Sequence, residues 1–303
     1  MQKLNRGYTL IEMILVVVIS AILAIGTFKA LQAIYLRSAK ARTLTELSLS
    51  SQIALDQISA MLYNRVPGTT IGYSPDGGIC EGIDELTATR PVLEWIGKAE
   101  DENIWRYYDS FIDIDTSGSI DFDANSTLSS ELNTSQLNLF FAGALEYGEE
   151  SGAKVCAGAY GWHGKDSNKS YDFTVPQDNK IHITDAVTPK FIYEKYYFGN
   201  GAYAVSRMAD IDKSASCIDN NITGEDDNNT LLLFYDYRPW KGETFCADPV
   251  NAGSRTGSVT VLSRDVASFE AYLANGSVHL GIDMNRSVNG GGIVQISKRK
   301  VAF

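Results

Sequence analysis

The hydrophobic pattern divides the chain into a long helical segment at the amino end and a strand-rich remainder. Residues 13–28 carry no charge, and with their apolar flanks they reach the roughly 20 residues that a bilayer-spanning helix requires. Apolar residues then continue at steps of three and four until the first stop signal, Pro67-Gly68. The pattern predicts one helix over residues 8–66, apolar on all sides over residues 8–31 and amphipathic afterwards. The later apolar positions are Leu31, Ile34, Tyr35, Leu44, Leu47, Leu55, Ile58, Met61 and Leu62.

Residues 67–303 have the pattern of strands, turns and polar loops. The stretch "VASFEAYLANGSVHLGIDM" alternates apolar and polar residues on both sides of Asn275-Gly276, which is a strong hairpin signal. Four other segments favour strands, namely "SVTVL", "GIVQISKRKVAF", "KFIYEKYYFG" and "TLLLFYDYR", while "LNLFFAGAL" fits a strand or a buried helix. We expect an α+β fold, with an antiparallel sheet packed on the amphipathic half of the helix and long insertions between residues 68 and 189.

Charge narrows the classes of partner that this chain can bind. The formal net charge is −11 over 303 residues, so the globular part is acidic. An acidic surface repels phosphate, so we expect no nucleic acid among the partners.

The four cysteines, Cys80, Cys156, Cys217 and Cys246, are too widely spaced for a C-x-x-C metal or redox motif. Their even number beside a membrane segment favours two disulfides formed in an oxidising compartment. Four buried free thiols are the alternative, and spacing alone does not give the pairing.

The first residues carry a specific motif. The segment "KLNRGYTLIEMILVVVISAIL" has a short basic leader ending in Gly7, an aromatic residue, Thr-Leu-Ile-Glu and an unbroken apolar stretch. It resembles the amino end of type IV prepilins and type II secretion pseudopilins, over about the first 30 residues. The resemblance implies that a prepilin peptidase removes residues 1–7 and that the new amino terminus, Tyr8, is N-methylated. Tyr8 is a mild departure, because the family more often has Phe there.

Glu12 is the unusual residue of the apolar segment. A carboxylate in the hydrocarbon costs about 2.5–3.5 kcal/mol or more, which makes it a functional candidate by default. In the family that it resembles, this carboxylate pairs with the amino terminus of a neighbouring subunit during assembly. The alternative is that Glu12 lies at the membrane interface and is solvated by lipid headgroups.

The resemblance implies a structural, non-enzymatic protein. We expect a minor pilin or minor pseudopilin, similar to the J or W type, that joins a pilus or secretion pseudopilus at its tip or initiation complex. Its partners would be other pilin or pseudopilin subunits, the prepilin peptidase, and the inner membrane with its assembly platform. The body, residues 67–303, would lie in the periplasm before assembly. A surface adhesin or a module that binds an exported substrate, carried on the same anchor, is the alternative.

The basic residues that flank the apolar run disagree with this topology. Only Lys3 and Arg6 precede the run, whereas four basic residues follow it, so a positive-inside count favours the reverse orientation. We give the motif more weight, because the cysteine-bearing body needs an oxidising side. The four residues are Lys29, Arg37, Lys40 and Arg42.

The resemblance also suggests how the cysteines pair. A Cys217–Cys246 bridge would resemble the disulfide-bounded carboxyl region of many pilins, and a Cys80–Cys156 bridge would close the insertion region in the same way. Each bridge would stabilise the fold by about 2–4 kcal/mol.

One loop has the spacing of a calcium site, although no cofactor is required. The segment "DIDTSGSIDFDA" has oxygen-bearing side chains near the positions of an EF-hand loop, with Gly118 at the sharp turn. The twelfth position is Ala124 instead of Glu, so any affinity should be weak. A plain polar turn explains the same composition equally well. The candidate ligands are Asp113, Asp115, Ser117, Ser119, Asp121 and Asp123.

Enzymatic motifs are not found in the sequence. The three histidines, His163, His182 and His279, are not part of an H-E-x-x-H motif, and no G-x-S-x-G, P-loop or dinucleotide fingerprint occurs. A tethered hydrolase would need a pocket that holds a histidine against a nucleophile.

Overall fold

The computed structural model describes most of the chain in two compact units. The first unit comprises residues 1–48 and 285–296, and the second comprises residues 49–284 and 297–303. The described residues are 9–76, 78–82, 89–99, 109–115, 118, 120–124, 128–141, 155–186, 188–189, 192–219, 222, 227–274 and 277–302.

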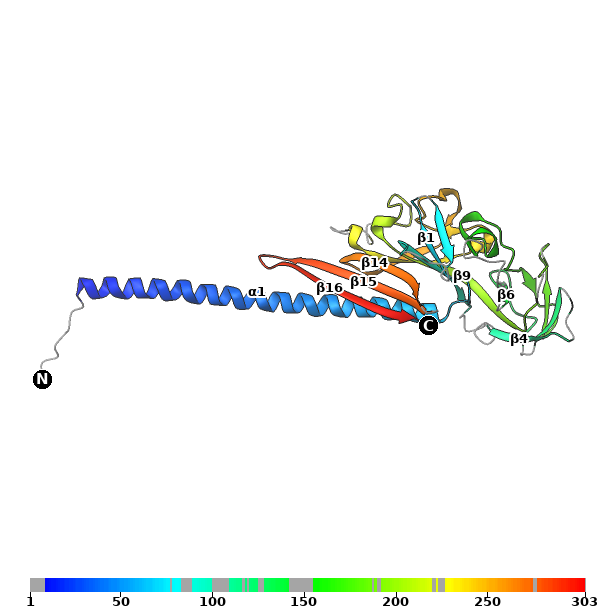
Figure 1. Ribbon diagram of the computed structural model, residues 1–303, viewed down its shortest axis with the longest axis horizontal. Helices are drawn as coiled ribbons and strands as arrows, with labels where there is room; N and C mark the ends of the chain where they lie inside the picture. Colours follow the sequence, from blue (N-terminus) through cyan, green and yellow to red (C-terminus); the bar gives the residue numbers. More distant parts are fainter. Residues whose placement is uncertain are drawn as a thin grey trace. The chain divides into compact units, whose positions relative to one another are not determined.

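Helix α1 runs without interruption from Leu10 to Tyr63, in agreement with the helix predicted over residues 8–66 (Figure 1). Pro67 cannot donate a backbone hydrogen bond, and Gly68 has a φ of 76°, so the helix ends just before this pair. The Val66 amide then donates to the Ile96 carbonyl at 2.9 Å, which connects the end of the helix to the sheet.

The carboxyl half of α1 is amphipathic, as the sequence pattern predicts. In the second unit its buried residues lie at helical spacing on one face, which packs into the body. The Ser50 and Ser263 hydroxyls are 2.8 Å apart, and Lys300 Nζ lies 2.5 Å from Asp56 Oδ1, so two strands of the body line this face and its margin. The buried residues are Ser51, Ala54, Leu55, Ile58 and Leu62.

Within the described residues, the body is built almost entirely from antiparallel strands, arranged as one sheet of eleven strands, one of three and one of two. The path through the largest sheet is β2-β1-β3-β9-β4-β5-β8-β7, with β6, β10 and β13 attached to it. The strands are β1 Ile71–Ser74, β2 Ile79–Gly82, β3 Val92–Lys98, β4 Asp109–Asp113, β5 Asp121–Ala124, β6 Asn138–Phe141, β7 Phe173–Thr174, β8 Lys180–Ile183, β9 Lys195–Arg207, β10 Leu231–Tyr237, β11 Thr244–Phe245, β12 Arg255–Thr256, β13 Ser258–Ser263, β14 Val266–Ala274, β15 Ser277–Val288 and β16 Gly292–Ala302.

Strand β9 is the centre of the largest sheet. It is 13 residues long and pairs with β3, β4, β6 and β10, all antiparallel. Its small residues allow large neighbours to approach: a Cβ on Gly199 would lie 2.8 Å from the Phe140 ring and 3.0 Å from Ile96. The glycines and alanines of β9 are therefore explained by packing in a central strand.

The strand predictions near the carboxyl end are confirmed. Strands β14 and β15 pair from Val266↔Met284 to Ala274↔Ser277, which is the predicted hairpin, and its turn residues Asn275 and Gly276 lie outside the described residues. The ambiguous "LNLFFAGAL" segment forms strand β6 in its first half. The segments "TLLLFYDYR" and "GIVQISKRKVAF" contain β10 and β16, and "SVTVL" forms most of β13. Only the second half of "KFIYEKYYFG" is strand, because β9 begins at Lys195 and continues past this segment to Arg207.

Two positions on α1 test how much the packing of the helix stabilises the body. Leu55 is 1% exposed, whereas Ile53 on the same helix is 46% exposed. Leu55→Ala should lower the free energy of unfolding by about 2–5 kcal/mol, because it leaves a cavity in a close-packed interface.

Ile53→Ala is the control and should change the free energy of unfolding by no more than about 0.5 kcal/mol, because its side chain is largely solvated. Denaturant unfolding of the full chain in detergent measures both values. Equal losses for the two variants would contradict the packing described for this half of α1.

Candidate functional site

The amino end of α1 contains the residues that the sequence singles out for processing and assembly. Gly7 and Tyr8 lie outside the described residues, whereas Glu12 lies in the first turn of the helix. The Glu12 amide donates to the Thr9 carbonyl at 3.0 Å and faces the Thr9 hydroxyl at 3.4 Å. Thr-Leu-Ile-Glu is thus also a capping-box sequence, so Glu12 sits where a helix dipole favours negative charge.

The apolar side chains that follow Glu12 have large exposed fractions within the described residues. Leu10 is 79% exposed, Val16 is 53% exposed and Ile22 is 65% exposed, and these three residues lie on different sides of α1. This helix is long and apolar enough to cross a membrane. A surface of this kind needs lipid or other apolar helices to cover it.

Both disulfides join the pairs of cysteines that the resemblance suggests. Cys80 on β2 is bonded to Cys156 in the turn Val155–Ala159, with a Cα separation of 5.8 Å. Cys217 is bonded to Cys246, with a Cα separation of 6.2 Å. No free cysteine is found in the described part of the chain.

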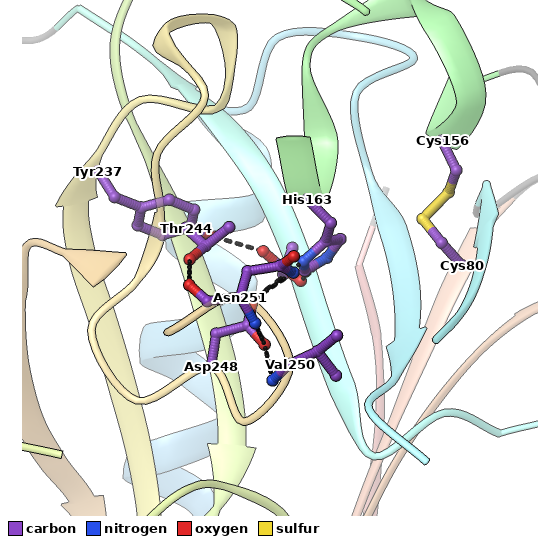
Figure 2. Close-up of polar contacts among 9 residues, drawn as sticks. Cys80, Cys156, His163, Tyr237, Thr244, Asp248, Val250 and Asn251 are labelled. Atoms are coloured by element: carbon purple, nitrogen blue, oxygen red, sulfur yellow. Dashed lines mark hydrogen bonds and ion pairs between the residues drawn. A yellow bond between two sulfur atoms is a disulfide. The ribbon is translucent and has the colours of Figure 1, made fainter. Parts of the chain in front are cut away.

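A buried cluster of charged side chains surrounds His163, which the short helix Trp162–Gly164 carries (Figure 2). The His163 Nε2 atom lies 2.9 Å from Glu94 Oε1, and its Nδ1 atom lies 3.2 Å from Asp248 Oδ2. The Tyr237 hydroxyl donates to the other Glu94 oxygen at 2.7 Å. The Tyr73 ring stacks on the imidazole with 3.7 Å between centroids. We call these five residues the His163 cluster.

Electrostatics keep this cluster charged despite its burial. Burial alone would lower the pKa of His163, but the neighbouring Glu94 and Asp248 carboxylates outweigh it and raise the pKa to about 9. Burial also opposes ionisation of Asp248, yet hydrogen bonds from His163, Asn251 and the Val250 amide hold the pKa of its carboxyl below the ordinary value. Burial and the nearby carboxylates raise the pKa of Tyr73 and of Tyr237.

Local backbone geometry places the His163 ring between the two carboxylates. His163 itself has a φ of 51°, which is uncommon for a residue with a side chain. Gly161 has a φ of 80°, and a Cβ there would lie 2.2 Å from the Pro239 carbonyl oxygen, so this position requires glycine. Cys156 and Cys246 anchor the chain close to His163 and Asp248 respectively.

The cluster has the chemistry of a structural ion network. Both ring nitrogens of His163 face carboxylates, so the imidazole is doubly protonated and has no free position to act as a base. His182 contacts Asp121 at 2.7 Å, and His279 stacks on Tyr272 with 5.1 Å between centroids. The arrangement that a tethered hydrolase would need is therefore not provided by His163.

No pattern in the sequence indicates the His163 cluster. Its ionisable members, Glu94, His163 and Asp248, are separated by 69 and 85 residues along the chain and form no motif. The one local signal is the "GWHG" segment, in which glycines flank an aromatic residue and a histidine.

The predicted calcium loop is the turn of the β4–β5 hairpin. Asp113 pairs with Asp123 in register, and the Gly118 amide donates to the Asp121 carbonyl at 2.8 Å. Asp121 and Asp123 form ion pairs with His182 and Lys180, and the Asp115 amide donates to Asp113 Oδ1 at 3.1 Å. Ser117 and Ser119 lie outside the described residues, so calcium binding stays a prediction.

The buried charge of His163 predicts a specific dependence of stability on pH. The pKa of His163 in the folded state, about 9, lies above the ordinary value of 6.5. The stabilising contribution is therefore complete below pH 6.5 and is lost as the pH rises through 9. His163→Gln should lower the free energy of unfolding by about 3–5 kcal/mol at pH 6, because two buried carboxylates lose their cation, and by less at pH 9.5.

The matched control is His182→Gln, because His182 forms an ion pair with Asp121 at a half-exposed position. That variant should cost no more than about 1 kcal/mol at either pH. Denaturant unfolding at both pH values measures the difference. A loss for His163→Gln that is the same at pH 6 and pH 9.5 would contradict a charged imidazole.

Comparison with known proteins identifies the amino-terminal segment. Residues 2–28 match the family described as Prokaryotic N-terminal methylation motif. No curated protein and no solved structure matches the chain. The chain therefore carries the N-terminal methylation motif of type IV prepilins and pseudopilins, on a pilin-like α+β fold.

Proposed function

We propose that this protein is a minor pilin or minor pseudopilin that assembles through α1 and presents its body near the tip of a type IV pilus or secretion pseudopilus. The observation that carries the proposal is the match of residues 2–28 to the methylation motif, joined to one continuous helix from Leu10 to Tyr63. Proteins with this motif are structural subunits, and the motif implies processing by a prepilin peptidase.

The carboxylate of Glu12 is the proposed assembly determinant. After cleavage behind Gly7, the new amino group on Tyr8 would lie one helical turn before Glu12. Both would be charged groups at the end of an apolar helix, where an unpaired charge is costly. Pairing Glu12 with the amino group of an adjacent subunit neutralises both charges and fixes the axial position of one helix against the next.

The outer face of α1 supports a helix-to-helix mode of assembly. Leu49, Ile53 and Tyr63 are 60%, 46% and 76% exposed and lie on the face opposite to the buried residues. The apolar surface of the helix therefore continues past the membrane segment, on the side that the body does not use. A neighbouring α1 could pack on this face.

The size of the body supports a place at the tip. Strands β4, β5, β6, β7 and β8 contribute aromatic and aliphatic side chains to a second buried core, which packs on β9. A body enlarged by these strands is difficult to pack repeatedly along the shaft of a filament. A subunit at the tip has neighbours on one side only, so it has room for a larger body. A role in initiation at the inner membrane follows from the same argument.

The proposed location before assembly is the inner membrane, with the body in the periplasm. The motif and the apolar helix suggest this anchoring. The two disulfides fit an oxidising compartment.

Substitutions of Glu12 test the assembly role separately from helix capping. Glu12→Gln keeps a side chain that suits the third position of the helix but removes the charge. Removing one partner of a desolvated charge pair costs about 2–5 kcal/mol, so incorporation into filaments should fall by more than about tenfold. Immunoblots of sheared filaments from cells with the full assembly system measure incorporation.

Glu12→Asp is the matched control, because it keeps the charge and should retain most of the incorporation. Both variants should remain in the membrane fraction, since the apolar stretch is unchanged. Normal incorporation of Glu12→Gln would reject the pairing role, and its loss from the membrane fraction would point to the helix instead of the charge.

A further inference from the structure

The first structural unit combines two segments that are far apart in the sequence. It contains α1 up to Ser48 and the end of the β15–β16 hairpin, residues 285–296. Arg286 Nη1 lies 2.6 Å from Glu46 Oε2, which fixes the base of this hairpin end on the helix. At the turn, a Cβ on Gly290 would lie 3.7 Å from Leu36, and one on Gly291 would lie 3.2 Å from the Lys40 side chain. The turn therefore lies beside Leu36 and Lys40 and points toward the amino end of α1 (Figure 1).

The position of this turn along α1 corresponds to the surface of a bilayer. The apolar side chains of the helix remain exposed from Leu10, at 79%, to Tyr35, at 72%. At a rise of 1.5 Å per residue, about 20 residues from Glu12 onward cross the roughly 30 Å of hydrocarbon, and about five more, up to Leu36, cross the headgroup layer. Leu36, and the turn that contacts it, then lie where the headgroups end.

The charges of this region differ from those of the remaining chain. The two segments of the first unit carry a net charge of +5 in the sequence, which leaves −16 for the second unit. Arg37, Lys40 and Arg42 are exposed, and within the described residues no acidic side chain forms an ion pair with them. They lie within two helical turns, or about 10 Å, of the end of the apolar stretch. This distance is about one Debye length, so headgroup charges still attract these side chains.

The hairpin adds an apolar side chain at the same height. Ile293, the second residue of β16, is 72% exposed, while the next residue, Val294, is 7% exposed. An exposed isoleucine beside basic residues is a combination that suits the interface of an anionic membrane, where the apolar group enters between the headgroups and the cations bind phosphate.

We propose that the turn of the β15–β16 hairpin, with Ile293, and the basic residues Arg37, Lys40 and Arg42 of α1 form one surface that binds anionic phospholipid headgroups. This inference rests on the proposed function, because it needs α1 to span the membrane. It also gives a role to the basic residues after the apolar run, which make the positive-inside count favour the reverse orientation. The subunit would be held at a defined height by the headgroup contact and would break this contact when it is extracted into a filament.

Three tryptophan substitutions in the full chain test the proposal in vesicles at low protein-to-lipid ratio. Leu31→Trp reports insertion, Ile293→Trp reports the hairpin, and Leu44→Trp reports a point on α1 about 12 Å beyond Leu36. The signal of the four native tryptophans is removed by subtracting the spectrum of the unsubstituted chain. Quenchers are brominated acyl chains for depth and a nitroxide attached to the headgroup for the surface.

In vesicles of phosphatidylcholine with phosphatidylglycerol, the Leu31→Trp variant should be quenched by the brominated chains. The Ile293→Trp variant should be quenched by the headgroup nitroxide, and the Leu44→Trp variant much less. The quenching of the Ile293→Trp variant should be lost in phosphatidylcholine alone, and also when Arg37, Lys40 and Arg42 are replaced by Gln.

The other outcomes distinguish this inference from the proposed function. Quenching of the Leu31→Trp variant without quenching of the Ile293→Trp variant would overturn the inference and leave the membrane anchor intact. Absence of quenching of the Leu31→Trp variant would overturn both. Equal quenching of the Ile293→Trp variant in neutral and anionic vesicles would overturn the assignment to anionic headgroups.

Discussion

One helix with two different surfaces is the constraint on which the remaining structure depends. Over its first half α1 presents apolar side chains in every direction, and from Ser51 onward it buries one face against the body. The backbone of α1 is continuous through both environments, so the apolar half and the half that packs on the body belong to one helix. Under the proposed function, this continuity joins the membrane anchor of the subunit to its folded body.

Disulfides and buried ionic contacts hold the loops of the body in place. Cys156 and Cys246 fix two loops by disulfides, and the His163 cluster links these loops to the central strands through Glu94 and Tyr237. Burying this many charges is costly unless each one has a partner, and here the imidazolium is paired at both nitrogens. The arrangement holds irregular loops in one position, which a small hydrophobic contact would do less specifically.

The parts of the fold that could be predicted from sequence are those encoded by local patterns. Helix α1, the β14–β15 hairpin and strands β10, β13 and β16 all follow from apolar spacing and turn residues that lie close together in the chain. Glu12 could be singled out because a carboxylate in an apolar run is anomalous by itself. The His163 cluster could not be predicted, because its members come from β1, β3, β10, the short helix Trp162–Gly164 and the loop of Asp248, which only the tertiary fold brings together. The contact of the β15–β16 turn with Leu36 likewise joins positions more than 250 residues apart.

The intact mass of the mature protein shows whether the amino end of α1 is a processed assembly element. The full chain should be co-expressed with a prepilin peptidase and, as a control, with a peptidase inactivated at its own catalytic site. With the active peptidase, we expect loss of the first seven residues, "MQKLNRG", and one added methyl group on Tyr8. With the inactivated peptidase, we expect neither change. A chain that keeps these residues in the presence of the active peptidase would contradict this processing.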